Sequence, residues 1–353
     1  MHSVCFLFCS VVCLGATQIG VTHVQQDLDP WNDQEAVARA EQLLSTGAIR
    51  YQNQHIMGWG GGNPEPSPGL YDWTTLDRRV ETMRRTGGTM VITLCCAPDW
   101  MKGGEPNNTD WSNLAVAPLQ EHYHDFAKLC GKVAGRYPDV KHFQVWNEMK
   151  GFWNKEEHRW AYENYTEMYN MVYQEVKNVS PSSKVGGPYT TTGAPGIISS
   201  LAGAWGAVDQ RLLDVIEYWL EHKVGADFIC IDGSLKETCW EEDYSTAVQK
   251  FFAINNWIKE RTNLPIWWSE WYPLPEETED MELGEQVDMF IEATLEMQGA
   301  EVVLTWPAQG YEGWTRGTMW NNTQYKDGGY PTAFFNVVKD FNSNYILENK
   351  INK

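Results

Sequence analysis

The most constraining feature of the chain is a regular alternation between short apolar runs and longer stretches of helical period. In the longer stretches apolar residues recur every three to four positions, as at Met168, Val172 and Val176. The short runs predict strands at 18–26, 48–60, 89–100, 140–148, 183–190, 226–232, 264–273 and 300–307. The longer stretches predict helices at 33–46, 72–87, 117–137, 165–176, 212–225, 244–261, 287–295 and 330–346.

Strands that alternate with helices of this size pair in parallel, and eight such units close into a (β/α)8 barrel. We therefore predict an α/β fold with a (β/α)8 TIM barrel. No Pro/Ser-rich linker or charge run divides the chain, so residues 17–353 are predicted to form a single domain. A doubly wound open sheet is the alternative. It would need a Gly-rich phosphate turn after the first strand, where the sequence reads VTHVQQDLDP.

Two predicted strands end in a carboxylate, on the face where such a barrel carries its site. The fourth strand reads FQVWNEM and reaches Glu148, and the seventh reads IWWSEWYP and contains Glu270. Glycoside cleavage needs such a pair, because one carboxyl group protonates the leaving oxygen while the other attacks the anomeric carbon or activates water. We predict that Glu148 and Glu270 are catalytic, with the separation of about 5–5.5 Å that belongs to retaining enzymes.

Several neighbours of this pair suit a sugar-binding cleft. The chain contains 18 Trp and 16 Tyr, whose flat rings offer apolar faces to a sugar. Asn147 precedes Glu148 and can bond a hydroxyl beside the reacting carbon. Tyr272 follows Glu270 by two positions and can hold that carboxylate in place. Three further aromatic residues near strand ends are predicted to wall the cleft: Trp59, Trp100 and Trp306.

Other chemistries lack their residues. His122 and His124 lie two apart on a predicted helix and point away from each other, so they form no metal pair, and we expect no metal and no cofactor. The sequence contains neither a Gly-x-Ser-x-Gly elbow nor a phosphate loop. Cys95 and Cys96 end an apolar strand without CxxC spacing and are predicted to be core. We interpret three more strand-end carboxylates as loop or structural groups: Asp27, Asp29 and Asp232.

The charge and the N-terminus bear on partners and location. A formal charge of −20 argues against nucleic acid or an anionic membrane as a partner, because both need a basic face. The stretch from Val4 to Leu14 is apolar, ends in small residues and is too short to span a bilayer, so residues 1–16 are predicted to be a secretory signal peptide. Glycosylation sequons begin at Asn107, Asn164, Asn178 and Asn321, which fits secretion. The oligomeric state stays open.

Removal of residues 1–16 leaves an odd number of cysteines, so at least one thiol is free or pairs elsewhere. Cys230 and Cys239 are the best candidates for a bridge, because they flank one loop. The cysteines that remain are Cys95, Cys96, Cys130, Cys230 and Cys239.

The sequence resembles the retaining glycoside hydrolases with a (β/α)8 barrel, and within them it is most similar to family 39. That family includes β-xylosidases, α-L-iduronidases and bacterial exopolysaccharide hydrolases. The resemblance runs from about residue 20 to residue 340 and is carried by YDWTTLDRRVETM, APDWM, VWNEMKGFW, VGGPYT, ADFICIDG and WWSEW. It implies that Glu148 is the acid/base, that Glu270 is the nucleophile and that Asn147 contacts the 2-hydroxyl of the sugar.

The chain departs from that family in two respects. The sixth strand of the family commonly ends with a His that binds the sugar, whereas FICIDG offers Asp232. Many relatives also carry a β-sandwich domain, and we expect none here, because the sequence continues only briefly after the last predicted helix.

The sequence thus predicts a secreted, metal-independent retaining glycosidase or endoglycanase acting on an oligo- or polysaccharide. The alternative is a catalytically inactive barrel that binds carbohydrate or has a structural role. Recognition of a uronate stays open, because the acidic stretch 276–282 would repel one while three cations in nearby loops could hold one. These cations are Lys150, Arg159 and Arg316.

Overall fold

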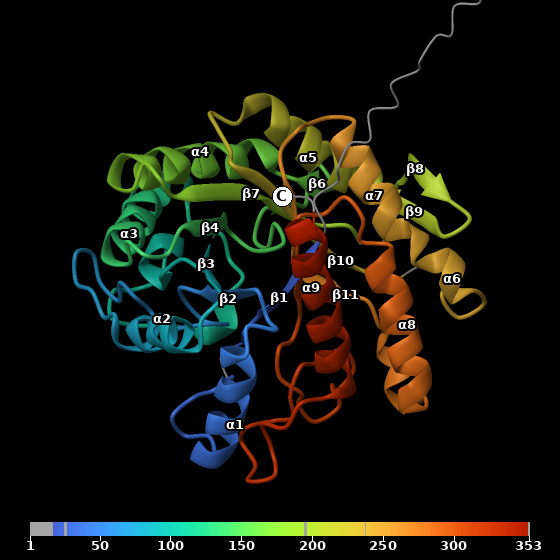
Figure 1. Ribbon diagram of the computed structural model, residues 1–353. Coiled ribbons are helices and arrows are strands. Elements are labelled where there is room, and N and C mark those ends of the chain that lie inside the picture. Colours follow the sequence, from blue (N-terminus) through green and yellow to red (C-terminus); the bar gives the residue numbers. More distant parts are fainter. Residues whose placement is uncertain (1–16, 25–26, 194–195, 237, 352–353) are drawn as a thin grey trace, which may run out of the picture.

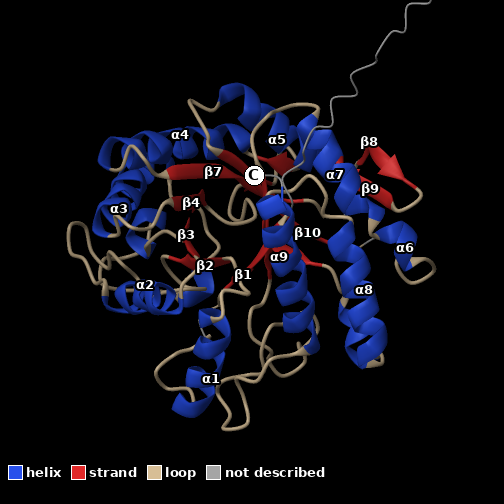
Figure 2. Cartoon of the chain, in the orientation of Figure 1, coloured by secondary structure: helices blue, strands red, loops and turns tan. Residues whose placement is uncertain are grey.

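The computed structural model describes residues 17–24, 27–193, 196–236 and 238–351, so the predicted signal peptide lies outside the described residues. Eight parallel strands close into a barrel in the order β1-β12-β11-β10-β7-β4-β3-β2. Figures 1 and 2 show these strands at the centre with the long helices around them. The predicted α/β fold with one (β/α)8 TIM barrel is confirmed.

Six of the barrel strands are shorter than the predicted runs, because the carboxyl ends of those runs belong to loops, whereas β7 and β10 have the predicted length and end one or two residues later. The strands are β1 Gln18–Thr22, β2 Tyr51–His55, β3 Thr89–Leu94, β4 His142–Val145, β7 Lys184–Thr191, β10 Phe228–Ser234, β11 Ile266–Tyr272 and β12 Val302–Thr305. The helices are α1 Gln34–Ser45, α2 Thr74–Thr86, α3 Tyr123–Arg136, α4 Tyr162–Val179, α5 Gln210–His222, α6 Tyr244–Ala247, α7 Gln249–Lys259, α8 Leu283–Leu295 and α9 Ala333–Ile351.

The loops contain structure that the sequence patterns do not reveal. Two antiparallel hairpins lie beside the barrel, β5 Trp153–Asn154 with β6 Arg159–Trp160, and β8 Ile198–Gly203 with β9 Gly206–Asp209. The helix predicted at 244–261 is divided into α6 and α7. Short 3₁₀ helices occupy Asp99–Lys102, Trp111–Asn113, Gln120–His122 and Glu276–Asp280.

The helices form where the sequence supplies an apolar face, and in α1 and α5 a side-chain cap as well. In α1, Ala36, Ala40 and Leu44 lie on one buried face, and the Asp33 side chain accepts a hydrogen bond from the Ala36 backbone N–H. Asp209 caps α5 in the same way by accepting from the Arg211 N–H. None of the described helices is long and apolar enough to cross a bilayer.

The interior of the barrel is layered along its axis. An apolar cluster begins near the start of the strands and extends to Tyr189 near the carboxyl end of β7; it comprises Val91, Tyr189, Phe228, Cys230, Trp267, Val302 and Leu304. Strand residues two apart face the same side, so the inward residues that follow Val91 and Trp267 are Thr93 and Ser269. These two residues belong to the next layer, which is polar.

This second layer, here called the polar ring, consists of Thr22, Asn53, Thr93, Gln144 and Ser269. All five are essentially inaccessible to solvent. Asn53 donates to the Thr22 hydroxyl at 3.1 Å, the Thr93 hydroxyl to Asn53 at 2.9 Å, and Gln144 to the Thr93 hydroxyl at 3.2 Å. The Ser269 hydroxyl donates to the Gln144 amide oxygen. The Thr22 hydroxyl donates to the Ser269 backbone carbonyl at 2.7 Å, which completes a closed circuit of hydrogen bonds. Each buried polar group therefore has a partner, which avoids the cost of desolvation.

The structure corrects the cysteine pairing. The predicted Cys230–Cys239 bridge is wrong, because both thiols are free, and the disulfide joins Cys95 to Cys96 instead. Cys230 lies inside the barrel within β10, whereas Cys239 follows in the loop beyond the end of that strand at Ser234. A strand rises about 3.3 Å per residue, so the two thiols are too far apart for a bridge. The prediction that Cys95 and Cys96 are core is confirmed, because both are buried.

Candidate active site

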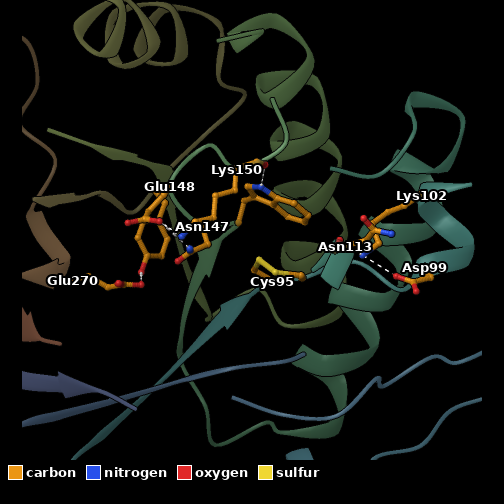
Figure 3. Close-up of a disulfide and its surroundings, with 11 residues drawn as sticks. Cys95, Asp99, Lys102, Asn113, Asn147, Glu148, Lys150 and Glu270 are labelled. Atoms are coloured by element: carbon orange, nitrogen blue, oxygen red, sulfur yellow. Dashed lines mark hydrogen bonds and ion pairs between the residues drawn. A yellow bond between two sulfur atoms is a disulfide. The ribbon is translucent and has the colours of Figure 1, made fainter. Parts of the chain in front are cut away.

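Three carboxyl groups meet at the carboxyl end of the barrel. Glu148 follows β4, Asp232 lies in β10 and Glu270 lies in β11, and one oxygen of each lies within 4.8 Å of the others. Figure 3 shows Asn147, Glu148, Lys150 and Glu270 gathered here, with the Cys95–Cys96 disulfide nearby. We call Glu148, Asp232 and Glu270 the carboxyl cluster. Its spacing is near the separation of about 5–5.5 Å in retaining glycosidases and below the roughly 6.5–9.5 Å of inverting ones.

A break in the strand pattern aims Glu270 inward. Ser269 belongs to the polar ring, so its neighbour Glu270 would point out of the barrel in a regular strand. The pairing of β11 with β12 shifts register between Trp268 and Trp271, and the pairing with β10 shifts beside Asp232. Such bulges re-aim side chains near active sites, and here two consecutive residues face the interior.

The backbone around the cluster is strained. Trp146, Glu148 and Met149 have φ values of 71°, 49° and 56°, and Tyr189 in β7 has φ of 52°. Each such non-glycine residue costs on the order of 1–3 kcal/mol, and strain of this kind gathers at functional sites. The strand that reads FQVWNEM therefore ends in a turn that holds Glu148 over the barrel mouth.

Glu270 is held from three sides. It is 5% exposed, the Tyr189 hydroxyl donates to its Oε1 at 2.7 Å, and the Tyr272 hydroxyl donates to its Oε2. With its amide oxygen toward Lys150 Nζ, Asn147 donates to Glu270 Oε1 at 3.0 Å. Burial raises the pKa of Glu270, while the Tyr272 hydrogen bond, the Lys150 charge and the Tyr189 hydrogen bond lower it. The hydrogen bond expected from Tyr272 is present, and Tyr189 is a contact that sequence reasoning missed.

Asp232 has the opposite surroundings. It is 2% exposed, and its Oδ2 has no hydrogen-bond partner within the described part of the chain. Burial raises the pKa of Asp232 well above its ordinary value, and the nearby charge of Glu270 adds to this. Hydroxyl donors bond Glu270, whereas Asp232 Oδ2 has no donor in the described part of the chain, so the ionised form is favoured at Glu270 over Asp232. Asp232 lies within β10 and not in a loop, and the interpretation of it as a structural carboxylate stays a prediction.

Glu148 is the most accessible member of the cluster. Its side chain is 18% exposed and forms an ion pair with Lys150, whose ammonium also lies 5.0 Å from the centre of the Trp59 ring. A group that exchanges protons with water must reach solvent, and Glu148 does. Carboxylates also ligate hard cations. In this cluster, however, the Lys150 ammonium already pairs with Glu148, and the hydroxyls of Tyr189 and Tyr272 already bond Glu270.

The predicted aromatic residues fall into two groups. Trp306 lies 5.3 Å, centroid to centroid, from Tyr272, and Trp59 lies beside Lys150, so both adjoin the cluster. Trp100 is buried, donates its indole N–H to the Glu65 carbonyl at 2.8 Å and packs edge-on against His122. These are the contacts of a packing residue, so substrate contact by Trp100 has no support from its surroundings.

Two cavities are lined by neighbours of the carboxyl cluster, and none of the three cluster residues lines either of them. One of about 670 Å³ is lined by Trp59 and by Trp31 and Trp111, which are 70% and 51% exposed. Another of about 470 Å³ is lined by Tyr272 and Trp314. Both have sizes typical of small-molecule sites. Exposed tryptophans in a cavity wall offer apolar faces with a polar edge.

Comparisons with known proteins bear on this site. The model of glycosyl hydrolases family 39 matches residues 10–282. No curated protein matches the chain. A monomeric β-xylosidase from Caulobacter crescentus CB15 is 17% identical with a TM-score of 0.60, over 94% of this chain and 68% of that one.

Two further solved structures share the fold. A family 39 enzyme from Xanthomonas axonopodis pv. citri is 16% identical with a TM-score of 0.60, over 94% of this chain and 66% of that one. A GH42 β-galactosidase from G. stearothermophilus is 12% identical with a TM-score of 0.62, over 94% and 56%. At these identities the structures show the fold alone, and the family model carries the assignment. The chain belongs to glycosyl hydrolase family 39.

Proposed function

We propose that the protein is a secreted retaining glycoside hydrolase that cleaves β-O-glycosidic bonds in an oligo- or polysaccharide by double displacement. The observation that carries this proposal is the pairing of Glu148 with Glu270 within 4.8 Å, one accessible and one buried among hydroxyl donors. Membership of the family supports the reaction class.

In the first step the Glu270 carboxylate attacks the anomeric carbon while Glu148 gives its proton to the departing glycosidic oxygen. A covalent glycosyl ester on Glu270 results. In the second step Glu148 takes a proton from water, whose oxygen attacks the anomeric carbon and releases Glu270 as a carboxylate. Two inversions give net retention. Asn147, which bonds Glu270 and lies beside Glu148, is placed to hold the 2-hydroxyl of the sugar.

The two cavities lined by Trp59 and by Tyr272, which both adjoin the cluster, support a substrate longer than one sugar. Three of the sequon asparagines are exposed, Asn107, Asn178 and Asn321, which supports glycosylation along a secretory route. The Cys95–Cys96 disulfide also favours an oxidising compartment.

Turnover of a panel of aryl glycosides, followed by proton NMR of the first products, tests the proposal. We expect hydrolysis of at least one aryl β-glycoside with the β anomer appearing first. Early α anomer would make the enzyme inverting and overturn the double displacement. Binding of oligosaccharides without turnover of any glycoside would instead favour the alternative of an inactive carbohydrate-binding barrel.

A further inference from the structure

The cavity of about 670 Å³, here called the tryptophan cavity, is large and contains none of the three carboxyl groups. It is lined mainly by the loops that follow β1, β2 and β3 and by the first half of α2. Three tryptophans line it, Trp31, Trp59 and Trp111, and of these Trp31 and Trp111 are 70% and 51% exposed. Large apolar side chains that stay in solvent around one cavity mark a binding surface.

Arg78 adds hydrogen-bond donors to the wall of the tryptophan cavity. Its Nη2 donates to Asp29 Oδ1 at 3.0 Å, and its guanidinium lies 5.5 Å from the centre of the Trp31 ring. Within the described residues Nη2 is the only nitrogen of Arg78 that donates a hydrogen bond, and the side chain is 31% exposed. An anchored donor beside an exposed ring suits a sugar, because the C–H face of the sugar stacks on the ring while a hydroxyl accepts from the N–H.

The tryptophan cavity adjoins the carboxyl cluster through Trp59. The Lys150 ammonium lies 5.0 Å from the centre of the Trp59 ring and pairs with Glu148. The cavity of about 470 Å³ adjoins the cluster through Tyr272, whose hydroxyl bonds Glu270, and is lined by the ends and loops of β10, β11 and β12. The two arcs of the barrel share no strand. A chain that occupied both cavities would therefore pass over both glutamates.

We propose that the protein cleaves its polysaccharide internally, with a sugar remote from the cleaved bond bound in the tryptophan cavity, where it stacks on Trp31 and accepts a hydrogen bond from Arg78. This inference rests on the proposed function and names its mode of action. Removal of single terminal sugars would use only one of the two cavities. Binding of remote sugars holds the reacting bond at the cluster, so it raises kcat/KM on long chains.

The test measures kcat/KM and first products on β-linked neutral and uronic acid oligosaccharides from disaccharide to hexasaccharide. In wild type we expect kcat/KM to rise by about tenfold or more with chain length. The first products of the hexasaccharide should each contain at least two sugars. Trp31→Ala should lower kcat/KM about tenfold on the hexasaccharide and change it less than about twofold on the disaccharide, which does not reach Trp31.

Arg78→Met is the second variant. It keeps an apolar stem beside Trp31 but removes the donors, so we expect a loss of about tenfold that is again confined to long chains. Asp29 keeps its hydrogen bond from Arg79 at 3.0 Å, so melting curves should change little. The matched control is Arg261→Met, because Arg261 is 32% exposed, bonds Glu217 at 2.8 Å and lies over the Trp257 ring, outside both cavities.

Tyr330→Ala is the matched control for Trp31→Ala. Tyr330 is 52% exposed, carries Arg39 over its ring at 4.6 Å and lines neither cavity, so its loss should leave the dependence on chain length unchanged.

Three results overturn the inference and leave the proposed function standing. They are single sugars as the first products of the hexasaccharide, turnover of aryl glycosides without cleavage of any oligosaccharide, and equal losses on short and long chains in both variants. Absence of turnover of every glycoside and oligosaccharide by wild type overturns the proposed function and the inference with it.

Discussion

The polar ring and the carboxyl cluster lie one above the other in the same barrel, and both are buried and polar. In the polar ring every side chain joins a closed circuit of hydrogen bonds. The carboxyl cluster is held by a bulge and by strained turns, and one of its oxygens has no partner in the described chain.

The difference separates two uses of buried polarity. A satisfied network fixes the shape of the barrel without demanding anything from a ligand. A polar network with an unpaired atom can gain a hydrogen bond from a ligand. Its strained backbone keeps its conformation only because the surrounding barrel packing holds it. Changes in the ring should therefore lower stability and spare catalysis, while changes in the cluster should do the reverse.

The largest effect is expected from Glu270→Gln in the cluster. This variant lacks the nucleophile but keeps the shape, so activity should fall by on the order of 10⁴-fold or more on every glycoside. Thermal unfolding should be unchanged or slightly raised, because a buried charge is gone. Initial rates and melting curves check both, with the exposed Glu285→Gln in α8 as the control. A variant that retained substantial activity would remove Glu270 from the chemistry.

Gln144→Leu tests the ring. The change leaves the Ser269 hydroxyl without its acceptor in a dry interior, which should lower the free energy of unfolding by about 1–3 kcal/mol. The kcat/KM of the folded variant should stay close to wild type. Denaturant unfolding measures the loss, and Gln174→Leu on the exposed face of α4 is the matched control. Unchanged stability would show that the circuit contributes nothing.

Trp306→Ala tests the wall beside the cluster. Trp306 packs against Tyr272 and the edge of Trp314, and a sugar stacked on it would lose that face. We expect kcat/KM to drop about tenfold with little change in melting temperature. If the variant melts early yet is fully active once folded, Trp306 is a packing residue.

The smallest effect concerns pH and Asp232→Asn. Asp232 keeps its proton to higher pH in the folded protein than in the unfolded chain, since burial raises its pKa. The folded state therefore binds more protons than the unfolded state above the ordinary aspartate pKa, and the free energy of unfolding falls as pH rises through that window, by about 1.4 kcal/mol per unit at most. In Asp232→Asn this pH dependence of the free energy of unfolding is absent. Urea unfolding measured from acidic to mildly alkaline pH should therefore show the variant becoming more stable relative to wild type as pH rises. A difference in stability that does not change with pH would refute the account.

The sequence predicts the eight-stranded barrel far better than the details of the site. The alternation of strands and helices predicts the barrel, and the position of Glu148 and Glu270 at strand ends was enough to place both at its carboxyl end. The β5–β6 hairpin was not predicted, because strands as short as Trp153–Asn154 show no periodicity.

The remaining misses depend on geometry along the barrel axis. Ser269 and Glu270 are neighbours that both face inward, which only a bulge permits, and no residue type announces that bulge. Tyr189 could have been found by applying the strand-end rule to β7 as well, whereas Asp232 was identified at a strand end and interpreted as a loop or structural group. The Cys230–Cys239 proposal failed because closeness in sequence ignored the depth of Cys230 inside the barrel.

The roles of the two glutamates are tested most directly by Glu148→Ala on dinitrophenyl and alkyl β-glycosides, with and without azide. A dinitrophenolate leaves without protonation, so its release should survive, whereas alkyl glycosides should lose about 10²–10⁴-fold. The glycosyl ester on Glu270 should then accumulate, and azide, which needs no general base, should raise turnover and give a β-glycosyl azide. Equal losses on both substrates, with no effect of azide, would contradict the assignment of Glu148 as acid/base and Glu270 as nucleophile.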